Sequence, residues 1–264
     1  MKSRTVCLDE TPLAPGLSPA EIHVREAGAG PPLVFLHGGW GYEIYPFDRQ
    51  LDAFGDRRVV IPDRTGYGRS PRITDLPVDF HRRAAAETSR VLDALGIERA
   101  ALWGHSDGAV IAVWMGLAEP DRFTAVILEA VHFYRVKPRS REFFETAVRD
   151  PDSLGDRVCR VLERDHGSDW RTLIRLGGTA WLALADTAPR PDADLYDGRL
   201  GELAPRATFV HGAEDPRTEP GELDAVRRAL PDAVFAVIPG AGHSPHSERG
   251  VFEECNSAVR AFLG

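Results

Sequence analysis

The amino-acid sequence predicts an α/β protein with a mostly parallel central sheet and helices on both of its faces. Short apolar runs bounded by turn residues recur along the chain, and such runs are typical of strands that are buried on both faces. Segments with the apolar spacing of helices lie between these runs. Alternating strands and helices favour parallel strands joined by right-handed crossovers. The apolar runs are at residues 33–36, 59–61, 100–103, 125–128, 207–210 and 234–238.

The other elements of this pattern follow in chain order. Residues 21–26 are expected to form an antiparallel edge strand. A helix is expected over residues 80–95, where apolar residues share one face and Gly96 supplies a C-cap. Further helices are expected at residues 109–118, 223–230 and 251–263.

The alternation of strands and helices stops between residues 132 and 203. This stretch has several helical pieces and no convincing strand, and it is too long for an ordinary crossover. We therefore expect a helical cap domain (lid), residues 132–203, inserted into a core domain of residues 1–131 and 204–264. The end of the cap, residues 186–197, is rich in Pro and Asp and is expected to be a mobile connection. The helical pieces are at residues 141–148, 154–165 and 170–185.

Composition restricts the classes of function. The 264 residues suffice for one large domain, and the formal net charge of −8 argues against nucleic acid or an anionic membrane surface as a partner. No apolar run approaches the roughly 20 residues of a membrane span. The cysteines Cys7, Cys159 and Cys255 are odd in number and far apart, which fits a reducing cytoplasm better than a disulfide framework. The oligomeric state stays open, with a homodimer as one option.

The sequence G-H-S-D-G at residues 104–108 leads directly from a predicted strand into a predicted helix. In this context the pattern indicates a nucleophile elbow, in which a serine occupies a strained, tight turn between glycines. Ser106 would then be the nucleophile, and the helix N-terminus and the backbone amide of Asp107 would favour a nearby oxyanion. The alternative is a turn whose serine has only a structural role.

A serine hydroxyl becomes a good nucleophile when a base takes its proton. His243, in a glycine-rich loop after the last predicted strand, is the expected base, and His246 is a weaker candidate. Asp215, just past the preceding strand, is the expected acid that orients the histidine, which completes the order serine, acid, histidine of a catalytic triad. Two other carboxylates compete with Asp215: the adjacent Glu214 and Glu129, at the end of the strand after the nucleophile helix.

The first long buried strand ends in H-G-G-W, residues 37–40. Its glycines let the backbone approach a bound carbonyl, so the N–H of Gly39 is the expected second donor of an oxyanion hole, with the amide of Asp107. Trp40 is expected to wall the acyl pocket. The pattern differs from a phosphate loop because no G-K-S/T follows and no helix starts there.

Four further residues are assigned to the substrate pocket: His105, Glu129, His132 and Trp181. If Glu129 is not the acid of the triad, it is expected to orient the His132 region or to line the pocket. The histidines of the chain have no regular ligand spacing, so we expect no metal, and serine chemistry of this kind requires no cofactor.

The chain resembles the α/β-hydrolase superfamily over nearly its full length. The motifs at residues 37–40 and 63–70, the Ser106 elbow, the Asp215 turn and the His243 loop occur in the order of that superfamily. The resemblance implies the α/β-hydrolase fold, with a mostly parallel sheet and a cap inserted after the sixth strand.

The elbow is similar to that of biphenyl-hydrolase-like and valacyclovir-hydrolase-type esterases, in which an Asp also follows the serine. The resemblance implies that Asp107 helps to bind a substrate amino group, whereas helix capping is the alternative role of this carboxylate. The serine at the elbow departs from epoxide hydrolases and haloalkane dehalogenases, whose nucleophile there is Asp.

Three functions are compatible with this sequence. The leading hypothesis is a serine esterase that cleaves a small-molecule ester through an acyl-enzyme. Hydrolysis of a carbon-carbon bond in a ring-fission product is the second, because such hydrolases share the fold, the triad and the cap. The third is a ligand-binding protein that has lost turnover, and the presence of Ser106, Asp215 and His243 together argues against it.

Overall fold

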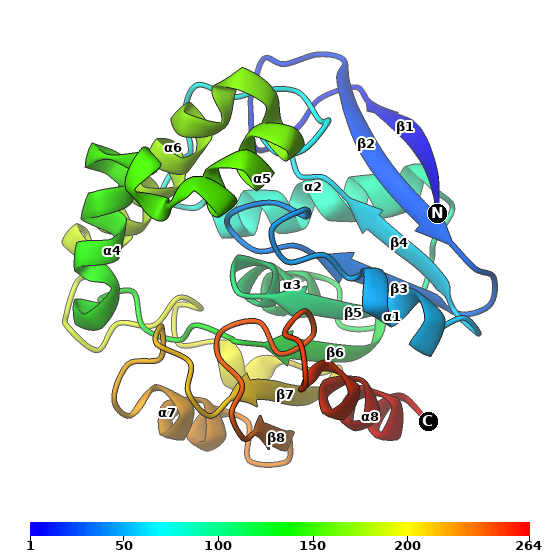
Figure 1. Cartoon of the computed structure of the whole chain (residues 1–264). Coiled ribbons are helices and arrows are strands. Elements are labelled where there is room, and N and C mark those ends of the chain that lie inside the picture. Colours follow the sequence, from blue (N-terminus) through cyan, green and yellow to red (C-terminus); the bar gives the residue numbers. More distant parts are fainter.

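The computed structural model describes residues 1–264 and contains one eight-stranded sheet (Figure 1). The strand order is β1-β2-β4-β3-β5-β6-β7-β8. β2 pairs antiparallel with β1 and with β4, and all other neighbouring strands are parallel, which confirms the predicted fold class. The strands are β1 (Lys2–Leu8), β2 (Ala20–Ala27), β3 (Pro32–Leu36), β4 (Arg58–Pro62), β5 (Ala100–His105), β6 (Phe123–Glu129), β7 (Arg206–Gly212) and β8 (Val234–Ile238).

The antiparallel side of the sheet differs from the prediction. The run at residues 21–26 forms β2, which is antiparallel as expected but is not an edge strand, because β1 covers its outer side. β1 itself was missed. Five of its seven residues are exposed, and only Val6 and Leu8 are buried, so it lacks the apolar run that reveals the central strands.

Helices cover both faces of the sheet. Side chains of α2 and α3 belong to the larger hydrophobic core on one face, and Cys255 and Val259 of α8 belong to a second core on the other. Gly96, just after α2, has a φ of 65°, as the predicted C-cap requires. The short α1 was not predicted. The helices of this part are α1 (Asp48–Ala53), α2 (Phe80–Ala94), α3 (Asp107–Ala118), α7 (Glu222–Ala229) and α8 (Phe252–Leu263).

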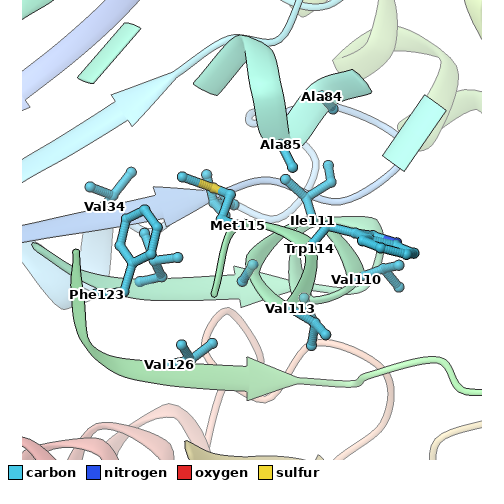
Figure 2. Close-up of a cluster of buried hydrophobic side chains, with 14 of the residues drawn as sticks. Val34, Ala84, Ala85, Val110, Ile111, Val113, Trp114, Met115, Phe123 and Val126 are labelled. Atoms are coloured by element: carbon cyan, nitrogen blue, oxygen red, sulfur yellow. The ribbon is translucent and has the colours of Figure 1, made fainter. Parts of the chain in front are cut away.

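Successive residues of the central strands point to opposite faces of the sheet. In β3, Val34 and Leu36 belong to the larger core, whereas Leu33 and Phe35 belong to the second core. Figure 2 shows Ile111 and other side chains of α3 gathered between the strands and α2. The ends of β3 and β5 are therefore held from both sides, which makes them rigid supports for the loops that follow.

Three helices lie between β6 and β7 in the chain, and Figure 1 shows them grouped at one side of the sheet. They match the three predicted helical pieces, whereas the division into a core and a cap domain stays a prediction. In the connection at residues 186–197, Ala193, Leu195 and Tyr196 are buried and residues 189–192 are exposed, and its mobility stays a prediction. None of the helices combines the length and the apolar character needed to cross a membrane. The three helices are α4 (Pro138–Arg149), α5 (Asp156–His166) and α6 (Trp170–Asp186).

Candidate active site

Ser106 lies at the sharp turn between β5 and α3, with a φ of 55° and a ψ of −119°. A non-glycine residue rarely adopts a positive φ, and such strain is concentrated at functional sites. The flanking glycines are sterically required. A Cβ on Gly104 would lie 2.1 Å from the carbonyl oxygen of Gly108, and one on Gly108 would lie 2.0 Å from that of Leu36. The local geometry is that of the predicted elbow.

The predicted acid and base are in contact. The carboxylate oxygens of Asp215, which follows β7, both lie 3.0 Å from Nδ1 of His243, which follows β8. Burial alone would raise the pKa of Asp215, but the hydrogen bond and the charge of His243 lower it to about 2. An ionised carboxylate only accepts hydrogen bonds, so it holds the proton on Nδ1 and leaves Nε2 of neutral His243 able to accept one. The rival carboxylate of Glu214 is exposed.

The second rival, Glu129, is fully buried and lies outside the pocket. One of its carboxylate oxygens accepts from the backbone N–H of His246 at 2.9 Å and from Nδ1 of the same residue at 2.7 Å. The other accepts from Nε1 of Trp103 at 2.8 Å. The assignment of Glu129 to the pocket or to the His132 region is therefore wrong, because its side chain is hydrogen-bonded to Trp103 and His246 and does not line the cavity. His246 is fully engaged as well, since Tyr45 O lies 3.0 Å from its Nε2.

The hydroxyl of Ser106 meets a different histidine in this structure. Its Oγ lies 3.2 Å from Nε2 of His132, whereas no hydrogen bond joins it to His243. The rings of His132 and His243 are roughly parallel, with centroids 5.7 Å apart, so the two imidazoles are neighbours at the nucleophile. The sequence predicts His132 in the pocket but carries no sign of this contact.

His132 is supported by a buried ion pair that was not predicted from the sequence. Nζ of Lys137 lies 3.0 Å from Nδ1 of His132 and 2.8 Å from both carboxylate oxygens of Glu222. Burial, followed by the charge of Lys137, holds the pKa of His132 well below its ordinary value. Lys137 and Glu222 are 85 positions apart, and neither belongs to a motif, so no sequence signal could have paired them.

Asp107 directs its side chain toward the pocket. One carboxylate oxygen accepts from Nε2 of His81 at 3.2 Å and from Nε1 of Trp181 at 3.1 Å. A Cβ on Gly39 would lie 2.7 Å from the other oxygen. Burial alone would raise the pKa of Asp107, but the hydrogen bond and charge of His81 lower it. Asp107 also lies in the first turn of α3, where the helix dipole favours a carboxylate, so both roles of this side chain stay predictions.

A cavity opens above Ser106 between the strand ends and the helices α4 and α6. It is lined by Gly39 and Asp107, whose backbone amides are the predicted oxyanion donors, and by four predicted pocket residues: Trp40, His105, His132 and Trp181. Aromatic side chains of α4 and the guanidinium-bearing Arg217 also line it, and they were not predicted. The additional aromatic residues are Phe143 and Phe144 of α4 and Tyr45.

The neutral state of His105 follows from its surroundings. Burial, together with the charge of His246, lowers the pKa of His105 to about 3. Its Nε2 lies 3.0 Å from both the backbone oxygen of His243 and the hydroxyl of Ser244. His105 thus fixes the loop that carries the predicted base and is engaged too fully to act as a base itself.

Residues 33–254 match the alpha/beta hydrolase family. The chain belongs to the α/β-hydrolase family. The superfamily predicted from the motifs is thereby confirmed, together with the fold.

Two relatives of this α/β hydrolase differ in their named activities. An epoxide hydrolase of Caballeronia sordidicola is 39% identical over 218 residues, which cover 72% of this chain and 64% of that protein, just under two thirds of its length. A 2-hydroxy-6-oxononadienedioate/2-hydroxy-6-oxononatrienedioate hydrolase of Burkholderia vietnamiensis is 37% identical over 273 residues, 92% of this chain and 90% of that protein.

Solved structures match the fold of this α/β hydrolase over nearly its whole length. An esterase from Thermogutta terrifontis superposes with a TM-score of 0.74 at 23% identity and covers 98% of both chains. E-2-(acetamidomethylene)succinate hydrolase gives a TM-score of 0.72 at 18% identity, with 98% of this chain and 99% of that one covered. At these identities the likeness concerns the fold alone.

Proposed function

We propose that this α/β hydrolase cleaves carboxylic esters through an acyl-enzyme, with Ser106 as nucleophile, His243 as base and Asp215 as the orienting acid. The observation that carries the proposal is the pairing of His243 Nδ1 with both oxygens of Asp215, beside a strained serine in the same cavity. The substrate is a small-molecule ester, and the reaction needs no cofactor. The cysteines are unpaired, which fits a reducing compartment, and we place the reaction in the cytoplasm.

The geometry supports a two-step reaction. Ser106 Oγ attacks the ester carbonyl while its proton passes to Nε2 of His243, and the amides of Gly39 and Asp107 hold the oxyanion. His243 then returns the proton to the departing alcohol, which leaves the acyl group on Ser106. Water attacks that acyl group with His243 again as the base, and the acid is released as Ser106 regains its proton.

A p-nitrophenyl ester tests this proposal. We expect a rapid burst of p-nitrophenol, about one equivalent per enzyme, followed by slower steady turnover. Ser106→Ala should abolish the burst, and Asp215→Asn should reduce kcat by orders of magnitude without unfolding the protein. A fluorophosphonate should label the wild type at Ser106. Full activity in Ser106→Ala would contradict the proposal, and a folded wild type that resists labelling would favour a catalytically idle, ligand-binding homologue.

Hydrolysis of a carbon-carbon bond is the second candidate, and Arg217 is the observation that favours it. Its guanidinium lines the cavity, has no ion pair or hydrogen bond in the protein, and lies 3.3 Å from the ring centroid of Phe143. A partly buried cation without a carboxylate partner suits an anionic substrate group. The relative from Burkholderia vietnamiensis, which matches over most of its length, is named for a dioate substrate.

Two substrates separate the candidates. A vinylogous 1,5-diketone that carries a carboxylate reports carbon-carbon cleavage, and a neutral p-nitrophenyl ester reports ester cleavage. If carbon-carbon cleavage is the function, the diketone should have the higher kcat/KM, and Arg217→Met should raise its KM while leaving the KM of the neutral ester unchanged. An epoxide in the same panel tests the activity named for the relative from Caballeronia sordidicola.

A further inference from the structure

A continuous line of hydrogen bonds reaches Ser106 through His132, whose ring lies beside that of His243. Both carboxylate oxygens of Glu222 lie 2.8 Å from Nζ of Lys137, and Nζ lies 3.0 Å from Nδ1 of His132. Nε2 of His132 lies 3.2 Å from Oγ of Ser106. The side chains of Lys137 and Glu222 are 2% and 0% exposed, so water cannot replace these partners.

The charge states in this line follow from the donors around Glu222. Besides Lys137, the backbone N–H groups of Phe133, Tyr134 and Glu219 all donate to its carboxylate oxygens. A protonated carboxyl group has an O–H that needs an acceptor, and all the neighbours of Glu222 named here are donors. The carboxylate of Glu222 is therefore ionised. Lys137 is accordingly the ammonium of a buried ion pair, and an ammonium has donors only.

The tautomer of His132 follows in turn. Because Lys137 can only donate, Nδ1 of His132 must accept, and the proton of the neutral ring is on Nε2. That N–H faces Ser106 Oγ and donates to it. His132 therefore cannot take the proton of Ser106, which leaves this role to His243.

We propose that His132 is a catalytic hydrogen-bond donor to Ser106 Oγ. The donor stabilises this oxygen when its bond to the acyl carbon breaks in deacylation. Lys137 and Glu222 are positioning residues that fix the tautomer of His132. The inference rests on the proposed acyl-enzyme function and specifies its second step. Oγ accepts a hydrogen bond from His132 and keeps its own proton available for His243. One histidine therefore donates to the hydroxyl, and the other takes its proton.

The donor acts when the tetrahedral intermediate of deacylation collapses. Water has added to the acyl carbon, and its proton is on His243. The bond between that carbon and Oγ breaks, the electron pair goes to Oγ, and His243 returns the proton to it. Negative charge thus develops on Oγ, and the N–H of His132 lies at hydrogen-bond distance from this atom.

Pre-steady-state kinetics with a p-nitrophenyl ester separate acylation from deacylation. His132→Leu removes the donor, and we expect deacylation to slow by about 10- to 100-fold, the effect of losing one hydrogen bond to a charged group. The burst amplitude should stay near one equivalent, and the burst rate should change much less. His132→Gln retains an N–H donor at the position of Nε2 and should restore most of the deacylation rate.

Tyr196→Phe is a matched control for the packing of the His132 segment. The hydroxyl of Tyr196 donates to the backbone oxygen of His132 at 2.6 Å and does not reach the ring. This variant should deacylate at the wild-type rate. If it slows as much as His132→Leu, the segment merely requires its packing and the proposal is wrong.

Nitrogen NMR of ¹⁵N-histidine-labelled wild-type protein reads the tautomer directly. We expect neutral His132 to carry its proton on Nε2, and Lys137→Met to release a mixture of tautomers and to slow deacylation. A proton on Nδ1 in the wild type would overturn the proposal, as would an unchanged deacylation rate in His132→Leu. A wild type that shows no burst and no labelling at Ser106 would instead overturn the proposed function itself.

Discussion

Gly108→Ala is the substitution for which the structure gives the clearest consequence. A Cβ at this position would lie 2.0 Å from the carbonyl oxygen of Leu36, 2.6 Å from its carbonyl carbon and 2.9 Å from the oxygen of His37. All three atoms belong to the backbone of β3 and the loop after it, so no side chain can turn aside. The start of α3 and the end of β3 must separate by about 1 Å or more to reach ordinary contact.

Overpacking of this kind costs about 1–3 kcal/mol, and a contact between two backbones belongs at the upper end, about 3 kcal/mol. Alanine in a helix gains about 1 kcal/mol over glycine, which leaves a net loss of about 2 kcal/mol. For a chain of this size the unfolding temperature should fall by roughly 4–8 °C. Because Gly39 follows this part of β3, its amide should shift with it, and a displacement of about 1 Å can cost about 100-fold in kcat.

Thermal unfolding and ester turnover of the same preparation measure both effects. Gly177→Ala in α6 is the matched control for stability, because a Cβ there meets no atom within 4 Å. It should stabilise the protein by about 0.5–1 kcal/mol. If Gly108→Ala unfolds at the wild-type temperature and turns over at the wild-type rate, the close approach of α3 to β3 is not needed for the elbow.

Three further predictions concern charge and pocket shape. Asp107→Asn should raise the KM of an α-amino ester several-fold more than that of the matching ester without the amino group, since the ionised carboxylate faces the cavity; equal changes in both would leave Asp107 without a role in recognition. Trp181→Ala should shift the preferred acyl chain of a p-nitrophenyl ester series to greater length, and an unchanged preference would remove Trp181 from the acyl pocket. The same variant should lower the free energy of unfolding in urea by about 3–5 kcal/mol. Burial would raise the pKa of Asp63, but the hydrogen bond of His23 and the charge of Arg25 lower it from 3.8 to about 2. The ionised carboxylate therefore stabilises the folded protein fully above about pH 4, and this contribution is lost as the pH falls toward 2. The loss should be about 2 kcal/mol, and Asp63→Asn should flatten this part of the curve of unfolding free energy against pH.

Much of this molecule could be predicted from local sequence signals. The strands from β3 to β7 carry apolar runs because both of their faces are buried, and β8 carries one although it is an edge strand with Val234 and Val237 exposed. The Ser106 elbow is visible because its glycines are sterically required in one short segment. β1, at the opposite edge, was not predicted because only Val6 and Leu8 of its seven residues are buried, so its sequence has no apolar run.

The missed parts of the site depend on contacts between distant segments. Lys137 and Glu222 are charged residues of a kind common on protein surfaces. Only the folded chain brings their side chains together as an ion pair. Glu129 was assigned to the pocket because it ends a strand at the correct sheet edge, but alternation along β6 turns its side chain to the face of Ile127 and away from Ser106. The end of a strand in the sequence predicts that a residue lies at the carboxyl edge of the sheet. Which face of the sheet its side chain occupies changes with a shift of a single residue.

The placement of the proposed triad along the chain has a consequence for biosynthesis. Ser106 follows β5, whereas Asp215 and His243 follow β7 and β8, more than a hundred residues later and beyond the three helices between β6 and β7. The ribosome therefore synthesises Ser106 long before the proposed base, His243. If the proposed triad is correct, hydrolysis begins only when β7 and β8 have joined the sheet, and the appearance of turnover during synthesis would report the completion of folding.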